Sequence, residues 1–347
     1  MPIRVLVVDD SAFMRRVIGE AVASQSDLQL AGVAHNGLDA LLKVEQLQPD
    51  VVTMDVEMPE MDGLTALRHL MARYPRPVVM LSSLTQEGAV TTLRALSIGA
   101  VDFVPKPSGS ISLDFHRVRE DLIQKIRIAA GARVRTAPVQ SAPRIAPVRP
   151  RASTISTQFA RLVVIGSSTG GPRALGSVVP QIRPDGRTAY LVVQHMPAGF
   201  TRSLAERLDS TSMLSVREAR AGDRLTPDTA LVAPGDHHLR LTAAGVVDLG
   251  DGPRVHGVRP SVDVTLDCVA EHFAKRAVIA ILTGMGHDGA DGALRVRQRG
   301  GYVVAEDEST CVVWGMPRAV VERGAADRVV PLDGIVDAIA AGVPAHA

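Results

Sequence analysis

A serine lies at the apex of a glycine-rich turn near the middle of the chain. Four aliphatic residues at 162–165 precede the turn, which reads Gly166-Ser-Ser168-Thr-Gly170-Gly-Pro172. The aliphatic run predicts a buried parallel strand, and Pro172 is typical of the first turn of a helix. Ser168 would follow the strand directly, where the free N–H groups of a helix start bind an oxyanion or a phosphate. The turn can therefore present a nucleophile, hold an anion, or serve only as a capped connection.

Two other strand-like runs in the second half of the chain end in residues that can assist a serine. The run at 190–194 is followed by His195, and the run at 277–282 leads to Asp288 in a glycine-flanked turn. The carboxyl ends of parallel strands meet at one edge of a sheet, so we expect Ser168, His195 and Asp288 to converge. His195 would accept the serine proton, and Asp288 would orient the imidazole and stabilise its charged form.

Other arrangements fit these residues less well. Three further histidines could join Asp288 in a metal site, but their spacing matches no common ligand motif; they are His237, His238 and His287. The chain order of serine, histidine and aspartate differs from the serine, acid, histidine order of α/β-hydrolases. The turn also lacks the Gly-Lys-Ser/Thr ending of a P-loop.

Acidic residues and a lysine follow the strand-like runs of the first 123 residues. Asp9 and Asp10 follow the first run and Asp55 follows the third, while Ser82 and Lys106 follow the fourth and fifth. Three carboxylates at one sheet edge repel one another unless a cation joins them. A hard cation such as Mg²⁺ accepts this oxygen-rich setting, and Lys106 can pair with an acid or with a phosphoryl oxygen.

Alternating strand-like and helix-like runs are expected to position both groups of residues. The first domain has strands at 4–8, 28–34, 51–54 and on to 101–104, with helices near 12–24 and 37–46. The alternation resumes with strands near 161–165, 190–194, 229–233, 277–282 and 302–305. This pattern predicts two α/β domains with doubly wound parallel sheets, at residues 1–123 and 159–347.

The segment between the two domains, residues 124–158, differs in composition. Residues 122–184 contain no Asp or Glu, residues 122–160 contain seven Lys or Arg, and four prolines lie between 133 and 158. Such a segment cannot bury enough apolar surface to form a core. We therefore expect a flexible, solvated linker.

The whole chain of 347 residues carries a net charge of +1, from 38 basic and 37 acidic side chains. This balance provides no field that favours nucleic acid or an anionic membrane. Cys268 and Cys311 are too few for a disulfide framework, which fits a reducing cytosol. The first strand reaches acids after four aliphatic residues, and no run approaches about 18 apolar residues, so we expect a cytoplasmic protein without a signal peptide or membrane insertion.

The first domain resembles the response-regulator receiver domain over its whole length. The matching segments are Val7-Val-Asp-Asp-Ser11, Met54-Asp-Val-Glu-Met-Pro-Glu-Met-Asp-Gly63, Met80-Leu-Ser-Ser83 and Phe103-Val-Pro-Lys-Pro107. The resemblance implies a flavodoxin-like fold in which Asp55 is phosphorylated by a chemotaxis histidine kinase. It also implies Mg²⁺ held by Asp10, Asp55 and the Glu57 carbonyl, with Asp9 contributing through water.

The same resemblance implies a switch that reads the phosphoryl group. Ser82 and Lys106 would contact its oxygens, and Phe103 would turn inward with Ser82. The bond between Lys106 and Pro107 is a candidate cis peptide, which costs less before proline than before other residues.

The second domain resembles the catalytic domain of chemotaxis protein-glutamate methylesterases, and the two likenesses together cover nearly the full chain. The matching segments are residues 166–172, 194–201, 233–235, 259–263, 283–290 and 315–318. The resemblance implies a Rossmann-like domain with Ser168, His195 and Asp288 as the triad and the Met285 backbone N–H as an oxyanion donor. Cys311 and Trp314 stand where related sequences often have other residues.

The two resemblances imply a phosphorylation-activated hydrolase that serves sensory adaptation in chemotaxis. It would demethylate glutamate γ-methyl esters on methyl-accepting chemotaxis receptors and deamidate receptor glutamines, with Mg²⁺ in the receiver and no cofactor in the esterase reaction. A rival is a non-enzymatic response regulator whose output domain binds a partner or a nucleotide; it would keep Asp55 but not depend on Ser168. A DNA-binding output would need a helix-turn-helix or a basic recognition stretch after the linker, and the sequence has neither.

Overall fold

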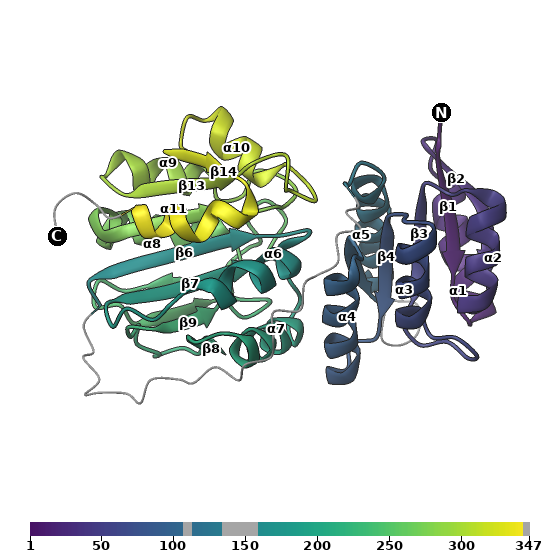
Figure 1. The fold of residues 1–347 in the computed structure, drawn as a ribbon, viewed down its shortest axis with the longest axis horizontal. Coiled ribbons are helices and arrows are strands. Elements are labelled where there is room, and N and C mark those ends of the chain that lie inside the picture. The colour runs from purple at the N-terminus through teal and green to yellow at the C-terminus, as the bar shows by residue number, and fades with distance from the viewer. Residues whose placement is uncertain (107–112, 134–158, 343–347) are drawn as a thin grey trace. The chain divides into compact units, whose positions relative to one another are not determined.

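A computed structural model describes residues 1–106, 113–133 and 159–342 of the chain. Its contacts divide the chain into two compact units, residues 1–140 and 141–347, and each unit is an α/β domain built on a parallel sheet (Figure 1). The two parallel-sheet domains confirm the predicted fold class. Within the described ranges, no helix is both long and apolar enough to cross a membrane.

The first unit is a five-stranded parallel sheet with the strand order β2-β1-β3-β4-β5. Helix α1 packs beside α5 on one face, and α2, α3 and α4 pack in a row on the other. The elements are β1 (Ile3–Val8), α1 (Ala12–Ala23), β2 (Leu28–Ala34), α2 (Gly37–Leu47), β3 (Val51–Asp55), α3 (Gly63–Arg73), β4 (Val78–Ser82), α4 (Gln86–Ile98), β5 (Asp102–Pro105) and α5 (Leu113–Ala130).

Local sequence explains both the strands and the helix starts of this unit. The aliphatic run Val5–Val8 of β1 is fully buried, as expected of a central strand covered on both faces. Helices α1, α2 and α3 begin at Ser11, Asn36 and Asp62, whose side chains each accept a hydrogen bond from a backbone N–H three residues on. The polar residues after the strands are thereby fixed at one edge of the sheet.

The end of the first domain differs from the expected boundary. Helix α5 continues through Ala130, so a linker that starts at residue 124 is wrong for its first residues. The helix persists because Ile123, Ile126 and Ala129 form a buried stripe. The rest of the expected linker, residues 134–158, lies outside the described residues, as does Pro107 with its candidate cis bond.

The second unit is a seven-stranded parallel sheet with the order β14-β13-β12-β6-β7-β9-β8, accompanied by an antiparallel pair, β10 and β11. The strands are β6 (Arg161–Ser167), β7 (Thr188–Gln194), β8 (Ser215–Glu218), β9 (Thr229–Val232), β10 (His238–Leu241), β11 (Val247–Gly250), β12 (Ala277–Ile281), β13 (Tyr302–Glu306) and β14 (Arg328–Val330). The helices are α6 (Gly171–Val178), α7 (Phe200–Thr211), α8 (Val262–His272), α9 (Ala290–Gln298), α10 (Met316–Glu322) and α11 (Ile335–Ala341), with 3₁₀ turns η1 (Val179–Gln181), η2 (Ala274–Arg276) and η3 (Leu332–Gly334).

The centre of this sheet positions the candidate site. Strand β6 pairs with β7 on one side and with β12 on the other, and all three run parallel. The residues that follow these strands therefore share one edge of the sheet.

Four strands were not predicted from the sequence, namely β8, β10, β11 and β14. They are three or four residues long, and β8 and β14 are the two edge strands, with exposed polar positions that resemble a loop.

A substitution in the central strand β12 tests how much the burial of this strand stabilises the second unit. Ile279 is fully buried, and Ile279→Ala should lower the free energy of unfolding by about 2–5 kcal/mol because it leaves a cavity. Urea unfolding can be followed by the fluorescence of the single tryptophan, Trp314, which lies in this unit. Val329→Ala is the matched control, since Val329 on β14 is 43% exposed. Equal losses in the two variants would contradict this picture of the core.

Candidate active site and acidic cluster

The backbone of Ser168 is held by three different elements of the second unit. Its N–H donates to the carbonyl of Thr283 at 3.0 Å. Its carbonyl accepts from Gln194 Nε2 at 2.9 Å and from the Gly171 N–H at 2.8 Å. Ser168 is thus fixed between the ends of β7 and β12 and the start of α6.

Close packing around this turn requires two glycines, one in the turn itself and one in the loop after β12. A Cβ on Gly171 would lie 2.0 Å from Gln194 Oε1, and a Cβ on Gly284 would lie 2.8 Å from Ser168 Cβ. Side chains at these positions would displace the groups that hold the serine. The glycine-rich turn predicted from the sequence therefore serves close approach as well as chain reversal.

His195 and Asp288 lie at the same edge of the sheet as Ser168. Ser167 and Gln194 are register partners on β6 and β7, so Ser168 and His195 are the next residues on neighbouring strands. Asp288 follows β12 on the other side of β6, and its Oδ2 lies 2.7 Å from His195 Nε2. The structure thus brings His195 and Asp288 into contact, and Ser168 lies at the end of the neighbouring strand.

Asp288 is buried and surrounded by hydrogen-bond donors. Its Oδ1 accepts from Ser261 Oγ at 2.7 Å and from the Asp263 N–H at 3.1 Å, while Oδ2 accepts from the Val262 N–H at 2.6 Å. Burial alone would raise the pKa of Asp288, but the bonds from His195, Ser261 and Val262 outweigh it and lower the pKa to about 2. Asp288 is therefore a carboxylate, and the start of α8 stabilises its charge.

The contact with Asp288 determines which nitrogen of His195 can act as a base. A carboxylate accepts hydrogen bonds, so it holds the ring proton on Nε2 and leaves a lone pair on Nδ1. Among the described residues, Nδ1 has no hydrogen-bond partner, and no hydrogen bond joins it to Ser168 Oγ. Such contacts often tighten only when a substrate is bound.

The loop after β12 carries Met285, the residue expected to supply an oxyanion donor. Gly284, which precedes Met285 in the chain, packs directly against Ser168. Met285 is therefore one residue away from the serine contact. The loop is anchored by a residue that sequence reasoning missed. The buried carboxylate of Glu306 accepts the Thr283 N–H at 2.8 Å, and the Thr283 carbonyl in turn holds Ser168. Burial raises the pKa of Glu306.

Ser261 and Gln194 were also missed, although both lie in segments that carried the family resemblance. Each of these side chains acts by holding another residue in place, so its position in the sequence matches no catalytic motif. The histidines of the rival metal site make other contacts in this structure: His237 contacts Asp251, and His238 contacts the Pro253 carbonyl and the Ser261 N–H. His287 stacks edge-on against His256.

In the first unit, the three predicted aspartates form an acidic cluster. Ligating oxygens of Asp9, Asp10 and Asp55 lie within 4.8 Å of one another. Lys106 Nζ lies 2.9 Å from Asp9 Oδ2 and 2.6 Å from Asp55 Oδ2. Oδ2 of Asp9 is buried and accepts no well-aligned hydrogen bond in this arrangement. The cluster therefore has the oxygen ligands and the uncompensated charge that suit a hard divalent cation.

Charge and burial work against each other at Asp55. Burial raises its pKa to about 6, although Lys106 acts in the opposite direction. Burial lowers the pKa of Lys106, but its close contacts with the carboxylates of Asp55 and Asp9 outweigh this and raise the pKa. The lysine stays charged beside the carboxylates.

The expected switch residues Ser82 and Phe103 lie on the neighbouring strands β4 and β5. Ser82 is buried, its hydroxyl donates toward the Gly88 carbonyl at 3.2 Å, and it accepts from Thr92 at 2.7 Å. Phe103, expected to turn inward, is already buried at 3% exposure, and Lys125 Nζ lies 5.2 Å from its ring centre.

Comparisons with known proteins agree along the whole chain. Residues 163–339 match the family model described as CheB methylesterase, and residues 5–114 match the response regulator receiver domain. Two relatives are named protein-glutamate methylesterase/protein-glutamine glutaminase. One, from Symbiobacterium thermophilum, is 55% identical over 99% of this chain and 97% of its own length. The other, from Thermotoga maritima, is 48% identical over 95% of each chain.

A solved structure supports the assignment of the second unit. The crystal structure of the Thermotoga maritima CheB methylesterase catalytic domain matches with a TM-score of 0.50 and 49% sequence identity. The match covers 52% of this chain and 97% of that one.

The low pKa of Asp288 predicts a specific dependence of stability on pH. Its folded-state pKa lies below the ordinary value of 3.8, so the ionised group stabilises the fold above that pH. This stabilisation is lost as the pH falls from 3.8 toward about 2. The difference in unfolding free energy between the wild type and Asp288→Asn should therefore shrink over this range, as measured by urea unfolding with Trp314 fluorescence. Asp333→Asn, at an exposed position in η3, is the control; a constant difference for Asp288→Asn would refute the assignment.

Proposed function

The chain belongs to the CheB methylesterase family, and we propose that Ser168, His195 and Asp288 carry out the reaction of its catalytic domain. The protein is a response regulator that demethylates glutamate γ-methyl esters on chemoreceptors, and it also deamidates receptor glutamines. The observation that carries the residue assignment is the 2.7 Å contact between His195 Nε2 and ionised Asp288, at the sheet edge where Ser168 lies.

The first half of the reaction forms an acyl-enzyme. Ser168 Oγ attacks the γ-carbonyl carbon of the methylated glutamate while its proton moves to Nδ1 of His195. The imidazolium is stabilised by Asp288, which remains ionised. His195 then gives the proton to the leaving oxygen, the ester C–O bond breaks, and methanol departs.

The second half restores the enzyme with the same groups. His195 takes a proton from water, whose oxygen attacks the acyl carbon, and then returns that proton to Ser168 Oγ as the bond to serine breaks. With a glutamine substrate, the nitrogen receives the first proton and ammonia leaves, so both activities need only this one set of residues. We assign the Met285 N–H to the developing oxyanion, because its loop packs against Ser168.

The receiver domain of the first unit accepts the regulatory phosphoryl group, and we assign Asp55 as the acceptor. Asp9, Asp10 and Asp55 would hold Mg²⁺, which offsets the negative charge of the phosphoryl oxygens when bound. Lys106, already 2.6 Å from Asp55, is placed to contact one of those oxygens. A chemotaxis histidine kinase is the proposed phosphodonor, and methyl-accepting chemotaxis receptors are the proposed substrates.

Phosphorylation can then act on the neighbouring strand end. Ser82 would exchange its hydrogen bond to the Gly88 carbonyl for one to a phosphoryl oxygen, which changes the contact between β4 and α4. A shift between two arrangements of the receiver would alter access to the esterase site. The receiver thereby limits hydrolysis until Asp55 is phosphorylated.

Loss of the nucleophile tests the catalytic assignment. Ser168→Ala should reduce methanol release from a methylated receptor fragment by roughly 10⁶-fold, because a triad without its nucleophile cannot form the acyl-enzyme. Ser177→Ala removes an exposed serine on the adjoining helix α6 and should leave the rate unchanged. A folded Ser168→Ala protein that releases methanol at a near-normal rate would show that Ser168 is not the nucleophile.

Control by the receiver is tested separately. Addition of a small phosphodonor with Mg²⁺ should raise methanol release by the wild type, whereas Asp55→Asn should stay at the basal rate. A shortened chain that begins at Thr154 lacks the receiver and should be active without a donor. If this shortened chain were no faster than the unphosphorylated full chain, the receiver would have to activate by contacts that it makes, and simple restriction of access would be wrong.

A further inference from the structure

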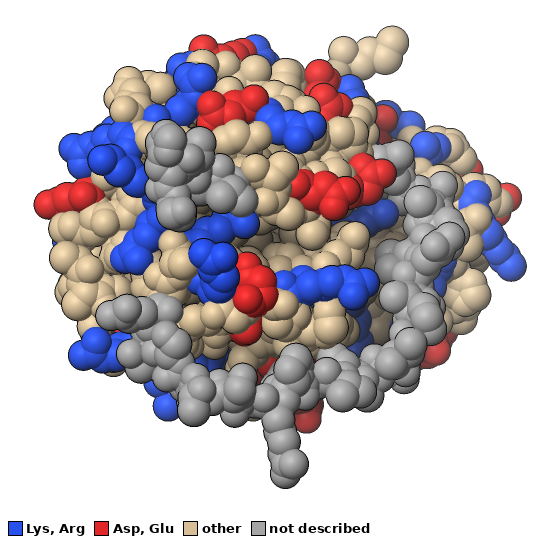
Figure 2. Space-filling model, turned by 60° about the vertical axis from the view of Figure 1, so that its left-hand side comes forward, with Lys and Arg blue, Asp and Glu red and all other residues tan. Residues whose placement is uncertain are grey.

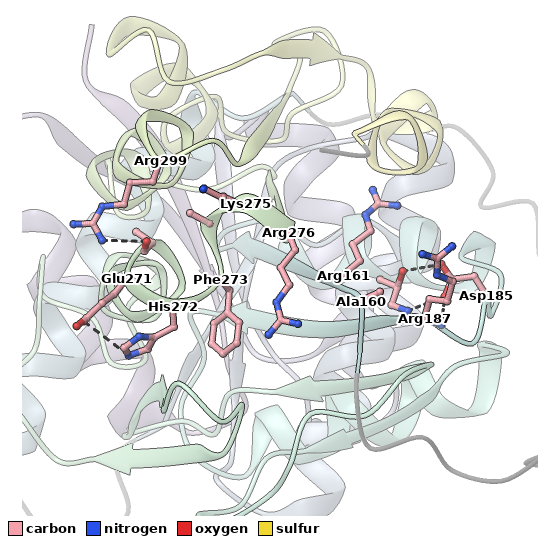
Figure 3. Close-up of a pocket in the computed structure, with 13 residues that line it drawn as sticks. Ala160, Arg161, Asp185, Arg187, Glu271, His272, Phe273, Lys275, Arg276 and Arg299 are labelled. Atoms are coloured by element: carbon pink, nitrogen blue, oxygen red, sulfur yellow. Dashed lines mark hydrogen bonds and ion pairs between the residues drawn. The ribbon is translucent and has the colours of Figure 1, made fainter. Parts of the chain in front are cut away.

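A cavity of 710 Å³ lies in the second unit, away from the candidate active site (Figure 3). Its lining includes Arg161 and Thr188, the first residues of β6 and β7, and Arg276, which directly precedes β12. These strands are parallel, so the cavity lies at their amino ends, whereas Ser168 and His195 follow their carboxyl ends. A seven-residue strand is roughly 20 Å long, and a ligand in the cavity would not reach the serine.

Basic side chains dominate this cavity. Five Lys or Arg residues line it, against two acidic residues, Asp185 and Glu271. The basic residues are Arg161, Arg187, Lys275, Arg276 and Arg299. The chain as a whole carries a net charge of only +1, so this local excess is not a reflection of overall composition. Figure 2 shows a hollow on this side of the molecule with Lys and Arg side chains on opposite sides of it.

The five cations form no salt bridge with a carboxylate of the described residues, although Asp185 interacts electrostatically with Arg161. Arg161 Nη2 donates to the backbone carbonyls of Ile339 and Gly342. Arg276 Nη1 donates to the Phe159 carbonyl at 3.0 Å, and Arg299 Nη1 donates to the Ala270 carbonyl at 3.1 Å. Neutral carbonyls orient these guanidinium groups without cancelling their charge.

The two acids contribute little compensation. Asp185 accepts hydrogen bonds from the backbone N–H groups of Arg187 and Thr188 and from the Thr188 hydroxyl, all at 2.7–2.8 Å. Its carboxylate is thus engaged by the turn that opens β7. Glu271 lies 3.9 Å from a ring nitrogen of its neighbour His272.

The central cation of the cavity is held in place by aromatic rings. The guanidinium carbon of Arg276 lies 4.5 Å from the ring centre of Phe159 and 5.0 Å from that of Phe273. These contacts and the Phe159 carbonyl fix a half-buried guanidinium that Figure 3 shows pointing into the middle of the cavity. A positioned arginine of this kind binds an anion with little loss of side-chain entropy.

We propose that this cavity binds a small phosphorylated anion, of the class of nucleotides and other organic phosphates. Phosphoryl groups offer several charged oxygens to guanidinium and ammonium donors, which here come from different elements around one cavity. The volume lies within the range of small-molecule sites, and the concave shape favours a compact ligand over an extended polymer.

The test uses the full chain in low-salt buffer with EDTA, so that the acidic cluster of the receiver cannot recruit metal-bound phosphate. Isothermal titration calorimetry with ATP, pyrophosphate and adenosine separates the contributions of the phosphoryl groups and of the base. ATP and pyrophosphate should bind, with an affinity that falls as salt is added, and adenosine should not. ATP binding tighter than pyrophosphate would identify a nucleotide site, and equal affinities would identify a site for phosphoryl groups alone.

Two variants locate the binding. The double variant Arg187→Glu, Lys275→Glu changes two exposed side chains on either side of Arg276 and should weaken ATP binding at least tenfold. Arg276→Met should do the same by removing the central cation. The control Arg240→Glu reverses the charge of an exposed arginine on β10 outside the cavity and should change the affinity less than twofold. The basal rate of methanol release by the double variant should match the wild type, which shows that it is folded.

Three results would overturn the proposal. Failure of ATP and pyrophosphate to bind the wild type at millimolar concentration and low salt would show that the cavity does not take phosphorylated anions. Equal binding by the wild type and the folded double variant would place the ligand elsewhere. Adenosine binding as tightly as ATP would show that phosphoryl charge is not what the protein recognises.

Discussion

A buried carboxylate is the constraint around which the catalytic unit is arranged. Asp288 can remain ionised inside the protein only because donors surround both of its oxygens. Two of those donors are backbone N–H groups at the start of α8, so the helix must begin at the active site. The charge held there fixes the imidazole of His195 with Nε2 toward Asp288. The position of one helix thus determines which nitrogen of the histidine faces Asp288 and which is turned away from it.

A parallel sheet allows one unit to carry two sites that do not meet. Residues that follow β6, β7 and β12 form the candidate active site, and residues that precede the same strands line the basic cavity. The two edges differ in chemistry: one holds a buried carboxylate and a histidine, and the other holds cations that form no salt bridge among the described residues. The receiver uses its carboxyl edge in the same way. Asp9 directly follows β1, and Asp55 is the last residue of β3.

The sequence alone was sufficient to predict which polar residues lie at the ends of the central strands. Aliphatic runs followed by Ser168, His195 and Asp55 carry a local signal, because a central strand must be apolar on both faces and its last residue must be accommodated at the edge. The short edge strands β8 and β14 were missed because they are half exposed and lack that signal. The linker was predicted to start too early, at residue 124. The absence of acidic residues beyond 123 indicated a linker more strongly than the buried stripe of Ile126 and Ala129 indicated a helix.

The basic cavity could not be predicted because its cations come from separate parts of the chain. Arg161, Arg187 and Arg299 are far apart in sequence. Arg161 opens a strand-like run, and the other two lie in segments that read as an ordinary solvated turn or helix end. Only the parallel register of β6, β7 and β12 brings these segments together. Glu306 escaped notice for a related reason, since it reaches Ser168 through Thr283 and not by direct contact.

Ser261 performs two tasks with one hydroxyl group, and this limits how the position can evolve. Its Oγ accepts the Val264 N–H as the cap of α8, and the same oxygen donates to Asp288 Oδ1. At an ordinary cap, aspartate or asparagine would serve as well as serine. Here aspartate would add a second negative charge beside Asp288, and asparagine would have to place a longer amide in a fully buried position. Selection for folding and selection for turnover therefore act on the same atom, and only a hydroxyl side chain satisfies both.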